Sequence, residues 1–128
     1  MEPILVIDDD PAVREALVQA LIVEGWPVVA LPDGWEAVDW LTGNRPSMVL
    51  LDWRLPDFNG DLVADTLRTS YGGEVPLLLV TGQPDSLAER ARAIGAFAYL
   101  QKPFDLDALY AAINRALPET ALRAKRSA

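Results

Sequence analysis

The chain has 128 residues, of which 51% are hydrophobic, so it can form one domain with a sizeable core. Its net charge of -8, from 19 acidic and 11 basic residues, argues against nonspecific binding to nucleic acid or to an acidic membrane surface. The sequence has no cysteine and no histidine, which excludes disulfides, thiolate or imidazole metal ligands and histidine-based catalysis. Any metal must therefore be held by oxygen ligands.

The N-terminus, Met1-Glu2-Pro3, lacks the basic region of a signal sequence. The apolar segment 3–7 is also too short to span a membrane. We therefore expect a cytoplasmic protein that binds neither membrane nor nucleic acid.

Five short apolar segments recur along the chain and predict β-strands. They are residues 3–7, 27–31, 48–51, 75–80 and 96–100. Most of them are continuous rather than alternating, which is typical of strands buried on both faces of a sheet.

Segments with helical periodicity alternate with these strands. They cover residues 11–24, 34–42, 60–71, 85–94 and 105–117. In the first helix the predicted core positions are Val13, Ala16, Leu17, Ala20 and Leu21; in the last they are Leu106, Leu109, Ile113 and Leu117. The alternation of strands and helices predicts an α/β fold, in which a parallel sheet is covered on both faces.

The helix ends carry recognisable capping residues. Asp10, Asp85 and Asp105 are placed to cap the first, fourth and fifth helices. Pro11 occupies the first helical position and Gly25 ends the first helix. We expect one domain over residues 1–118, followed by a C-terminal tail or the start of a linker over 119–128.

Polar residues follow four of the five predicted strands. Strand one ends at Asp8-Asp9-Asp10, strand three at Asp52, strand four at Thr81-Gly82 and strand five at Lys102-Pro103. Ligands of such sheets bind beyond the carboxyl ends of the strands. Residues from four separate parts of the chain should therefore meet at one edge.

Three carboxylates at this edge require a cation. Two like charges about 4 Å apart repel by roughly 4 kcal/mol at an effective dielectric near 20. Mg²⁺, a small hard ion, suits one or two carboxylates with a backbone carbonyl and waters, whereas the loop alternation of a Ca²⁺ site is absent from the sequence after Asp8. Mg²⁺ usually accompanies phosphate, and an aspartate can accept a phosphoryl group.

Each of these residues also has an ordinary structural explanation. Asp10 alone fits a helix cap better than a metal ligand, the Asp8-Asp9 pair can be a solvated strand end, and Lys102 can be a surface lysine. The joint pattern carries the information, because acids, hydroxyl and lysine fall at successive strand ends.

These segments resemble the receiver domain of bacterial two-component response regulators. The resemblance covers residues 3–117 and rests on four segments: 4–10, 49–60, 76–82 and 95–104. The most specific feature joins the acid pair and Lys102-Pro103 to Asp52, with Pro56 four residues after it and Gly60 eight after. The resemblance implies a flavodoxin-like, doubly wound (βα)5 fold with strand order 2-1-3-4-5.

The resemblance also implies residue roles. Asp52 corresponds to the phospho-acceptor, and Thr81 and Lys102 to the residues that bind phosphoryl oxygens. Asp9, Asp52 and the backbone carbonyl of Arg54 correspond to direct ligands of Mg²⁺, for which Mn²⁺ can substitute, and Asp8 acts largely through metal-bound water. Tyr99 corresponds to the switch aromatic and Pro103 to a residue that aims the lysine through a cis bond.

The implied function is a phosphorylation switch. A sensor histidine kinase or a phosphotransfer protein would supply the phosphoryl group. Movement of Thr81 would let Tyr99 rotate and reshape the face formed by the fourth helix, fifth strand and fifth helix. The module would catalyse only its own phosphorylation and dephosphorylation, and would not be a turnover enzyme.

Three other classes fit parts of the pattern. A degenerate receiver would bind partners without phosphorylation, but the acid, hydroxyl and lysine set is complete. An Asp-nucleophile phosphohydrolase typically needs a second Asp where Arg54 stands. A flavodoxin would need a Ser/Thr/Gly-rich phosphate loop in place of residues 8–10.

The output partner is open. No DNA-binding segment follows the fifth predicted helix, so the chain either acts alone by docking on a target or belongs to a longer regulator or hybrid kinase. Two phosphorylated copies could also pair through the fourth-helix face.

Overall fold

The computed structural model describes residues 2–82 and 86–117. Strands and helices alternate along this part of the chain, as predicted, and their ends agree with the predicted ends to within two residues. The elements are β1 (Ile4–Ile7), α1 (Pro11–Val23), β2 (Val28–Leu31), α2 (Gly34–Gly43), β3 (Met48–Leu51), α3 (Asp61–Tyr71), β4 (Leu77–Thr81), α4 (Leu87–Ala93), β5 (Ala98–Gln101) and α5 (Leu106–Ala116).

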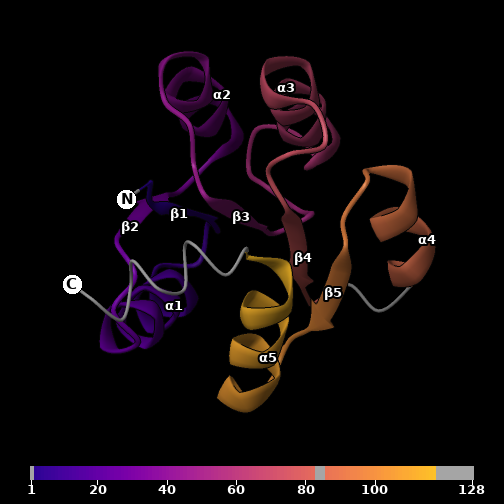
Figure 1. The fold of residues 1–128 in the computed structure, drawn as a ribbon. Coiled ribbons are helices and arrows are strands. Elements are labelled where there is room, and N and C mark those ends of the chain that lie inside the picture. Colours follow the sequence, from indigo (N-terminus) through magenta and orange to yellow (C-terminus); the bar gives the residue numbers. More distant parts are fainter. Residues whose placement is uncertain (1, 83–85, 118–128) are drawn as a thin grey trace.

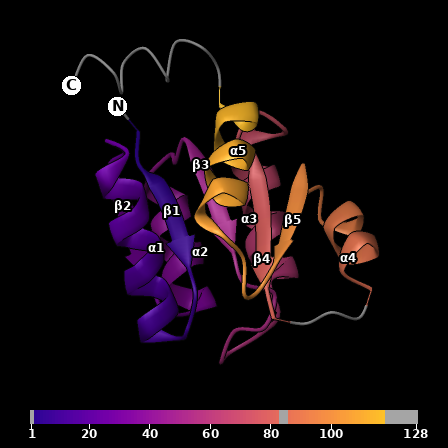
Figure 2. The same ribbon diagram turned by 90° about the horizontal axis from the view of Figure 1, so that it is seen from below.

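The strands form a 5-stranded sheet in the order β2-β1-β3-β4-β5, and all neighbouring strands are parallel. This confirms the predicted α/β fold and strand order. Helices α2, α3 and α4 cover one face, and α1 and α5 cover the other (Figure 1). The strand arrowheads point to the same side of the molecule (Figure 2), so the carboxyl ends share one edge.

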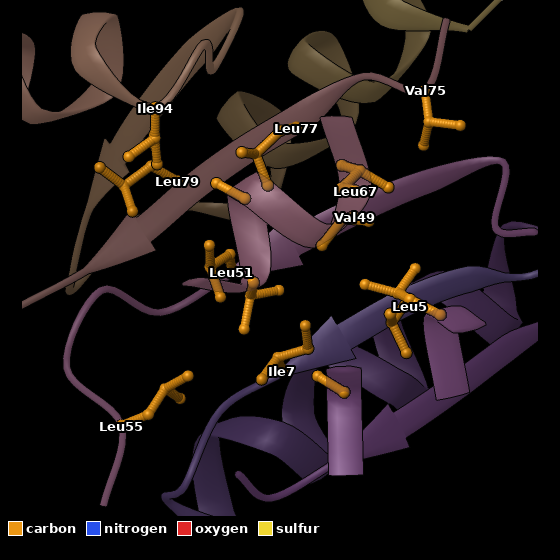
Figure 3. Packing of buried hydrophobic residues seen from close by; sticks show 14 of the residues in the cluster. Leu5, Ile7, Val49, Leu51, Leu55, Leu67, Val75, Leu77, Leu79 and Ile94 are labelled. Atoms are coloured by element: carbon orange, nitrogen blue, oxygen red, sulfur yellow. The ribbon is translucent and has the colours of Figure 1, made fainter. Parts of the chain in front are cut away.

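The core consists of two apolar layers, one on each face of the sheet. Alternate residues of the central strands supply both layers. For example, Leu5 and Ile7 face α2 and α3, whereas Ile4 and Val6 face α1 and α5. Figure 3 shows the first layer, in which strand leucines interlock with Leu67 and Ile94. The strands β1, β3 and β4 are buried throughout, and this holds their carboxyl ends in fixed positions.

The predicted caps that fall in the described residues are present. Asp10 accepts hydrogen bonds from the backbone N–H groups of Ala12 and Val13, and Asp105 accepts one from Ala108. Gly25 follows α1 with a φ of 89°, a conformation that favours glycine. The predicted cap Asp85 lies outside the described residues.

The edge strands β2 and β5 are only partly buried, because each has one neighbouring strand. One part of the predicted helix packing is wrong. Ala16 and Leu106 were predicted to face the core, but Ala16 is exposed and Leu106 has 49% of its surface exposed. Both line an open groove of about 380 Å³ between α1 and the β5–α5 loop. The first turn of α5 therefore leaves space where periodicity predicts contact.

None of the helices in the described ranges combines the length and apolar character that crossing a bilayer requires.

Candidate functional site

The carboxyl ends of the strands bring four chemically active residues to one edge of the sheet. Asp8 follows β1, Asp52 follows β3, Thr81 ends β4 and Lys102 follows β5. The register pairs the last residues of β1 and β3, and the N–H of Asp52 donates to the carbonyl of Ile7 at 3.0 Å. Sheet pairing thus sets Asp8 and Asp52 next to each other, as predicted from the chain pattern.

Asp8, Asp9 and Asp52 form an acidic cluster. Each can offer a carboxylate oxygen, and these oxygens lie within 4.8 Å of one another. Asp8 and Asp52 are buried, whereas Asp9 is exposed. Three hard oxygen donors that converge in this way match the preference of a small divalent cation, so the residues present fit a metal of that class.

Lys102 ties the cluster together. Its Nζ donates to Asp8 Oδ2 at 2.6 Å and to Asp52 Oδ2 at 3.0 Å. One ammonium thus partly compensates two buried carboxylates, which would otherwise repel each other strongly. The predicted meeting of this lysine with the carboxylates is confirmed.

The site perturbs two of its titratable groups. Burial raises the pKa of the Asp8 carboxyl above its ordinary value of 3.8, although the hydrogen bonds from Lys102 and from the N–H of Asp10 act in the opposite direction. Burial also lowers the pKa of Lys102, but the hydrogen bonds to Asp8 and Asp52 outweigh it and leave a net rise above 10.5. The lysine therefore stays charged beside the carboxylates.

Thr81 lies on the opposite side of the site from β1. Its side chain is almost completely buried, with 1% exposed, and its carbonyl accepts a hydrogen bond from the N–H of Lys102 at 2.9 Å. Open space surrounds the next residue, since a Cβ at Gly82 would meet no atom within 4 Å.

Tyr99 and Pro103 flank this arrangement on β5 and just after it. Tyr99 has 45% of its surface exposed and borders a groove with Ser86, Leu87 and Gln101, between α4 and β5. The Lys102–Pro103 peptide bond is cis, as the resemblance implied.

The loop between β3 and α3 carries Arg54 beside the acidic cluster. The N–H of Arg54 donates to Asp52 Oδ1 at 3.2 Å, and an antiparallel bridge joins Arg54 to Asn59. The loop thus folds back on itself, with the Arg54 peptide held against Asp52.

Two further contacts involve Asp8 and Trp53, the residue after Asp52, and the sequence pattern singles out neither. Arg14 reaches from α1 to donate to the Asp8 carbonyl at 2.8 Å. Arg90, on α4, lies over the ring of Trp53, with 5.2 Å from the guanidinium carbon to the ring centroid. For Arg14, the sequence offers only its position one helical turn after Asp10 as an indication of this contact. Nothing in the sequence near Trp53 or Arg90 predicts that these two residues meet.

This geometry agrees with comparisons to known proteins. A family model described as the response regulator receiver domain matches residues 4–114. The response regulator MprA of Mycobacterium sp. (strain KMS) is 43% identical over 119 residues, which are 91% of this chain and 51% of that relative.

Two solved structures share both the fold and detectable sequence identity. The response regulator TrrA of Thermotoga maritima, in complex with Mg(2+)-BeF, is 28% identical with a TM-score of 0.82, over 91% of this chain and 100% of that one. The receiver domain of the sensor histidine kinase PA1611 of Pseudomonas aeruginosa PAO1, with magnesium coordinated in its active-site cleft, is also 28% identical. Its TM-score is 0.81, over 89% of this chain and 95% of that one.

The chain therefore belongs to the response regulator receiver domain family. It is a phospho-accepting module of two-component signal transduction and not a turnover enzyme. The chain spans about half the length of the curated relatives it matches.

Proposed function

We propose that Asp52 is the phospho-acceptor of this receiver. The observation that carries the proposal is its place: it is a buried carboxylate at the end of β3, and it shares Lys102 with Asp8. In the transfer, an Asp52 carboxylate oxygen attacks phosphorus as the P–N bond of a kinase phosphohistidine breaks. The electron pair of that bond passes to the leaving imidazole nitrogen, and an acyl phosphate remains on Asp52.

Mg²⁺ is the metal that best fits the donor set, and Mn²⁺ can replace it. We assign Asp9, Asp52 and the Arg54 backbone carbonyl as direct ligands, with Asp8 acting through metal-bound water. The convergence of the three carboxylates supports this assignment, as do the two magnesium-containing relatives. The bound ion would neutralise charge on the phosphoryl oxygens.

Lys102 and Thr81 are assigned to the phosphoryl group itself. The Lys102 ammonium already lies within hydrogen-bonding distance of Asp52, so it can move from a carboxylate oxygen to a phosphoryl oxygen by a small rotation. Thr81 supplies a hydroxyl donor from the buried end of β4. The ammonium can offset part of the added charge of about -1 that phosphorylation brings, and the neutral hydroxyl can donate a hydrogen bond to a phosphoryl oxygen.

Phosphorylation would change the surface formed by α4, β5 and α5. Tyr99 is the mobile aromatic in this scheme, and its exposed ring borders the groove beside α4. Helix α4 is short, and its N-cap residue Ser86 has a φ of 57° and makes no side-chain cap. Such an end costs free energy to hold in place, which favours a helix that can shift.

The partners follow from the proposed switch. A sensor histidine kinase or a phosphotransfer protein supplies the phosphoryl group, and the reshaped surface binds an output domain, a target protein or a second phosphorylated copy. The alternative of a receiver that acts without phosphorylation loses support from the complete set of carboxylates, hydroxyl and lysine at one edge. A phosphohydrolase loses support because Arg54 stands where its second Asp is needed.

Mass spectrometry after treatment with acetyl phosphate and Mg²⁺ tests the acceptor. The expected result is one added phosphoryl group in the wild-type protein and none in Asp52→Ala or in the presence of a chelator. Equal phosphorylation of Asp52→Ala would refute the assignment.

A further inference from the structure

The β3–α3 loop reaches from the acidic cluster to the beginning of α2. The bridge between Arg54 and Asn59 and the hydrogen bond from Gly60 N–H to the Trp53 carbonyl, at 2.8 Å, close this loop. Asp57 and Phe58 lie at its tip, between the two bridged residues.

The Asp57 carboxylate binds two backbone N–H groups of α2. Gly34 donates to Oδ1 at 3.0 Å and Trp35 donates to Oδ2 at 2.8 Å, across 23 and 22 positions of the sequence. These donors belong to the first turn of the helix, where backbone N–H groups lack partners within the helix and carry partial positive charge. Both oxygens of one carboxylate therefore hold the loop tip to the helix.

Phe58 fixes the same contact sterically. A Cβ at Gly34 would lie 2.4 Å from the Phe58 ring, so the ring occupies the space that any other side chain at position 34 would need. The ring also meets Trp35 edge to face, with 5.1 Å between centroids. The loop tip thus has one packed position on α2.

We propose that Asp57 is a positioning residue for the metal and phosphoryl-transfer site. It anchors the far end of the closed loop whose near end presses the Arg54 peptide against Asp52. Loss of this anchor lets the Arg54 carbonyl move relative to the carboxylates, and metal affinity falls. The inference rests on the proposed function, in which that carbonyl is a ligand.

Asp33 offers a matched control, because it caps the same helix from the position just before it in the chain. Its carboxylate accepts from the N–H of Glu36 at 2.8 Å. Asp33→Ala and Asp57→Ala each remove one negative charge and side-chain hydrogen bonding to the first turn of α2, from a half-buried position for Asp33 and an exposed one for Asp57. Only Asp57→Ala also releases the β3–α3 loop.

The experiment measures Mn²⁺ binding to the whole chain from the electron paramagnetic resonance signal of the free ion, at a temperature where circular dichroism shows all variants folded. We expect Asp57→Ala to weaken binding about 10-fold, in the range typical for loss of a group that orients metal ligands. Asp57→Asn, which keeps one acceptor oxygen, should fall between it and the wild type. Asp33→Ala should stay within about 2-fold of the wild type, since it leaves the ligands in place.

Phosphorylation by acetyl phosphate supplies a second readout. The rate for Asp57→Ala should be reduced at limiting Mg²⁺ and should recover at saturating Mg²⁺, a rescue that a loss of folding would not show. Equal effects of Asp33→Ala and Asp57→Ala, or wild-type binding by Asp57→Ala, would overturn the inference. If the wild-type protein itself neither bound Mn²⁺ nor became phosphorylated, the proposed function would fail instead.

Discussion

Two clusters of charged side chains lie at opposite ends of the strands and differ in burial. At the carboxyl ends, Lys102 pairs with Asp8 and Asp52, whose side chains are 2% and 10% exposed. At the amino ends, Arg45 pairs with Glu2 and Glu74, whose side chains are 51% and 74% exposed. In each place one cation pairs with two carboxylates, and the carboxyl-end cluster also includes the exposed Asp9.

Because the two clusters differ in burial, they have different roles in the protein. Exposed ion pairs are screened by water and add little to stability. Buried carboxylates pay for desolvation, and they retain a strong attraction for any cation that can enter. The amino-end cluster therefore joins chain segments, with Arg45 also over the ring of Tyr71, whereas the carboxyl-end cluster is primed to bind a cation.

The largest expected effect comes from removing the cation of each cluster in turn. Lys102→Met leaves two buried carboxylates unpaired, and we expect the free energy of unfolding of the metal-free protein to fall by about 3 kcal/mol. Arg45→Met should cost about 1 kcal/mol or less. Urea unfolding at pH 7 with a chelator measures both. Similar losses in the two variants would show that burial does not separate the clusters.

Mg²⁺ should stabilise the protein through the carboxyl-end cluster alone. At ten times its dissociation constant, the ion should raise the free energy of unfolding by about 1.4 kcal/mol. Asp9→Asn should abolish this gain with little effect on the metal-free protein, because Asp9 is exposed. Glu2→Gln, the control at the other end, should keep the full gain. Thermal unfolding with and without Mg²⁺ gives the comparison, and a gain retained by Asp9→Asn would remove that residue from the ligand set.

Sequence alone predicts the carboxyl-end cluster well, for a physical reason. Asp8 and Asp52 each follow a fully apolar strand, and Lys102 follows the fifth apolar segment. The alternation of strands and helices predicts a parallel sheet, and a parallel sheet gathers the carboxyl ends of its strands at one edge. No knowledge of side-chain packing is needed to bring these residues together.

The contacts that sequence does not predict depend on how loops and helix ends meet. Asp57 accepts hydrogen bonds from α2 residues that lie 22 or more positions away in the sequence. The residues around Asp57 form no pattern that predicts this contact. Leu106 has the correct helical spacing for the core, yet the groove beside α1 leaves it exposed. Periodicity gives the direction of a side chain from its own helix, but it does not say whether another element fills the space there.

The smallest expected effect is on the pH dependence of stability. It distinguishes Asp57 from Asp8, two carboxylates at the same end of the sheet. Desolvation raises the pKa of Asp57, but the hydrogen bonds from Trp35 and Gly34 outweigh it and leave the pKa below 3.8. The pKa of Asp8 lies above 3.8 because the side chain is buried. The contribution of Asp57 to stability is therefore complete above pH 3.8 and is lost as the pH falls through its lowered pKa. The contribution of Asp8 to stability has the opposite sign. Its buried charged form destabilises the folded protein at neutral pH, and protonation removes this destabilisation as the pH falls toward 3.8.

Unfolding free energies of the metal-free protein between pH 7 and pH 2.5 separate the two contributions. Relative to the wild type, Asp57→Asn should lose less stability below pH 3.8, because the proton-linked loss at that carboxylate is gone. Asp8→Asn should lack the gain in stability that protonation of Asp8 gives the wild type as the pH falls from 7 toward 3.8. If lowering the pH changed the stability of both variants, relative to the wild type, in the same direction, then burial would not explain the difference between Asp8 and Asp57.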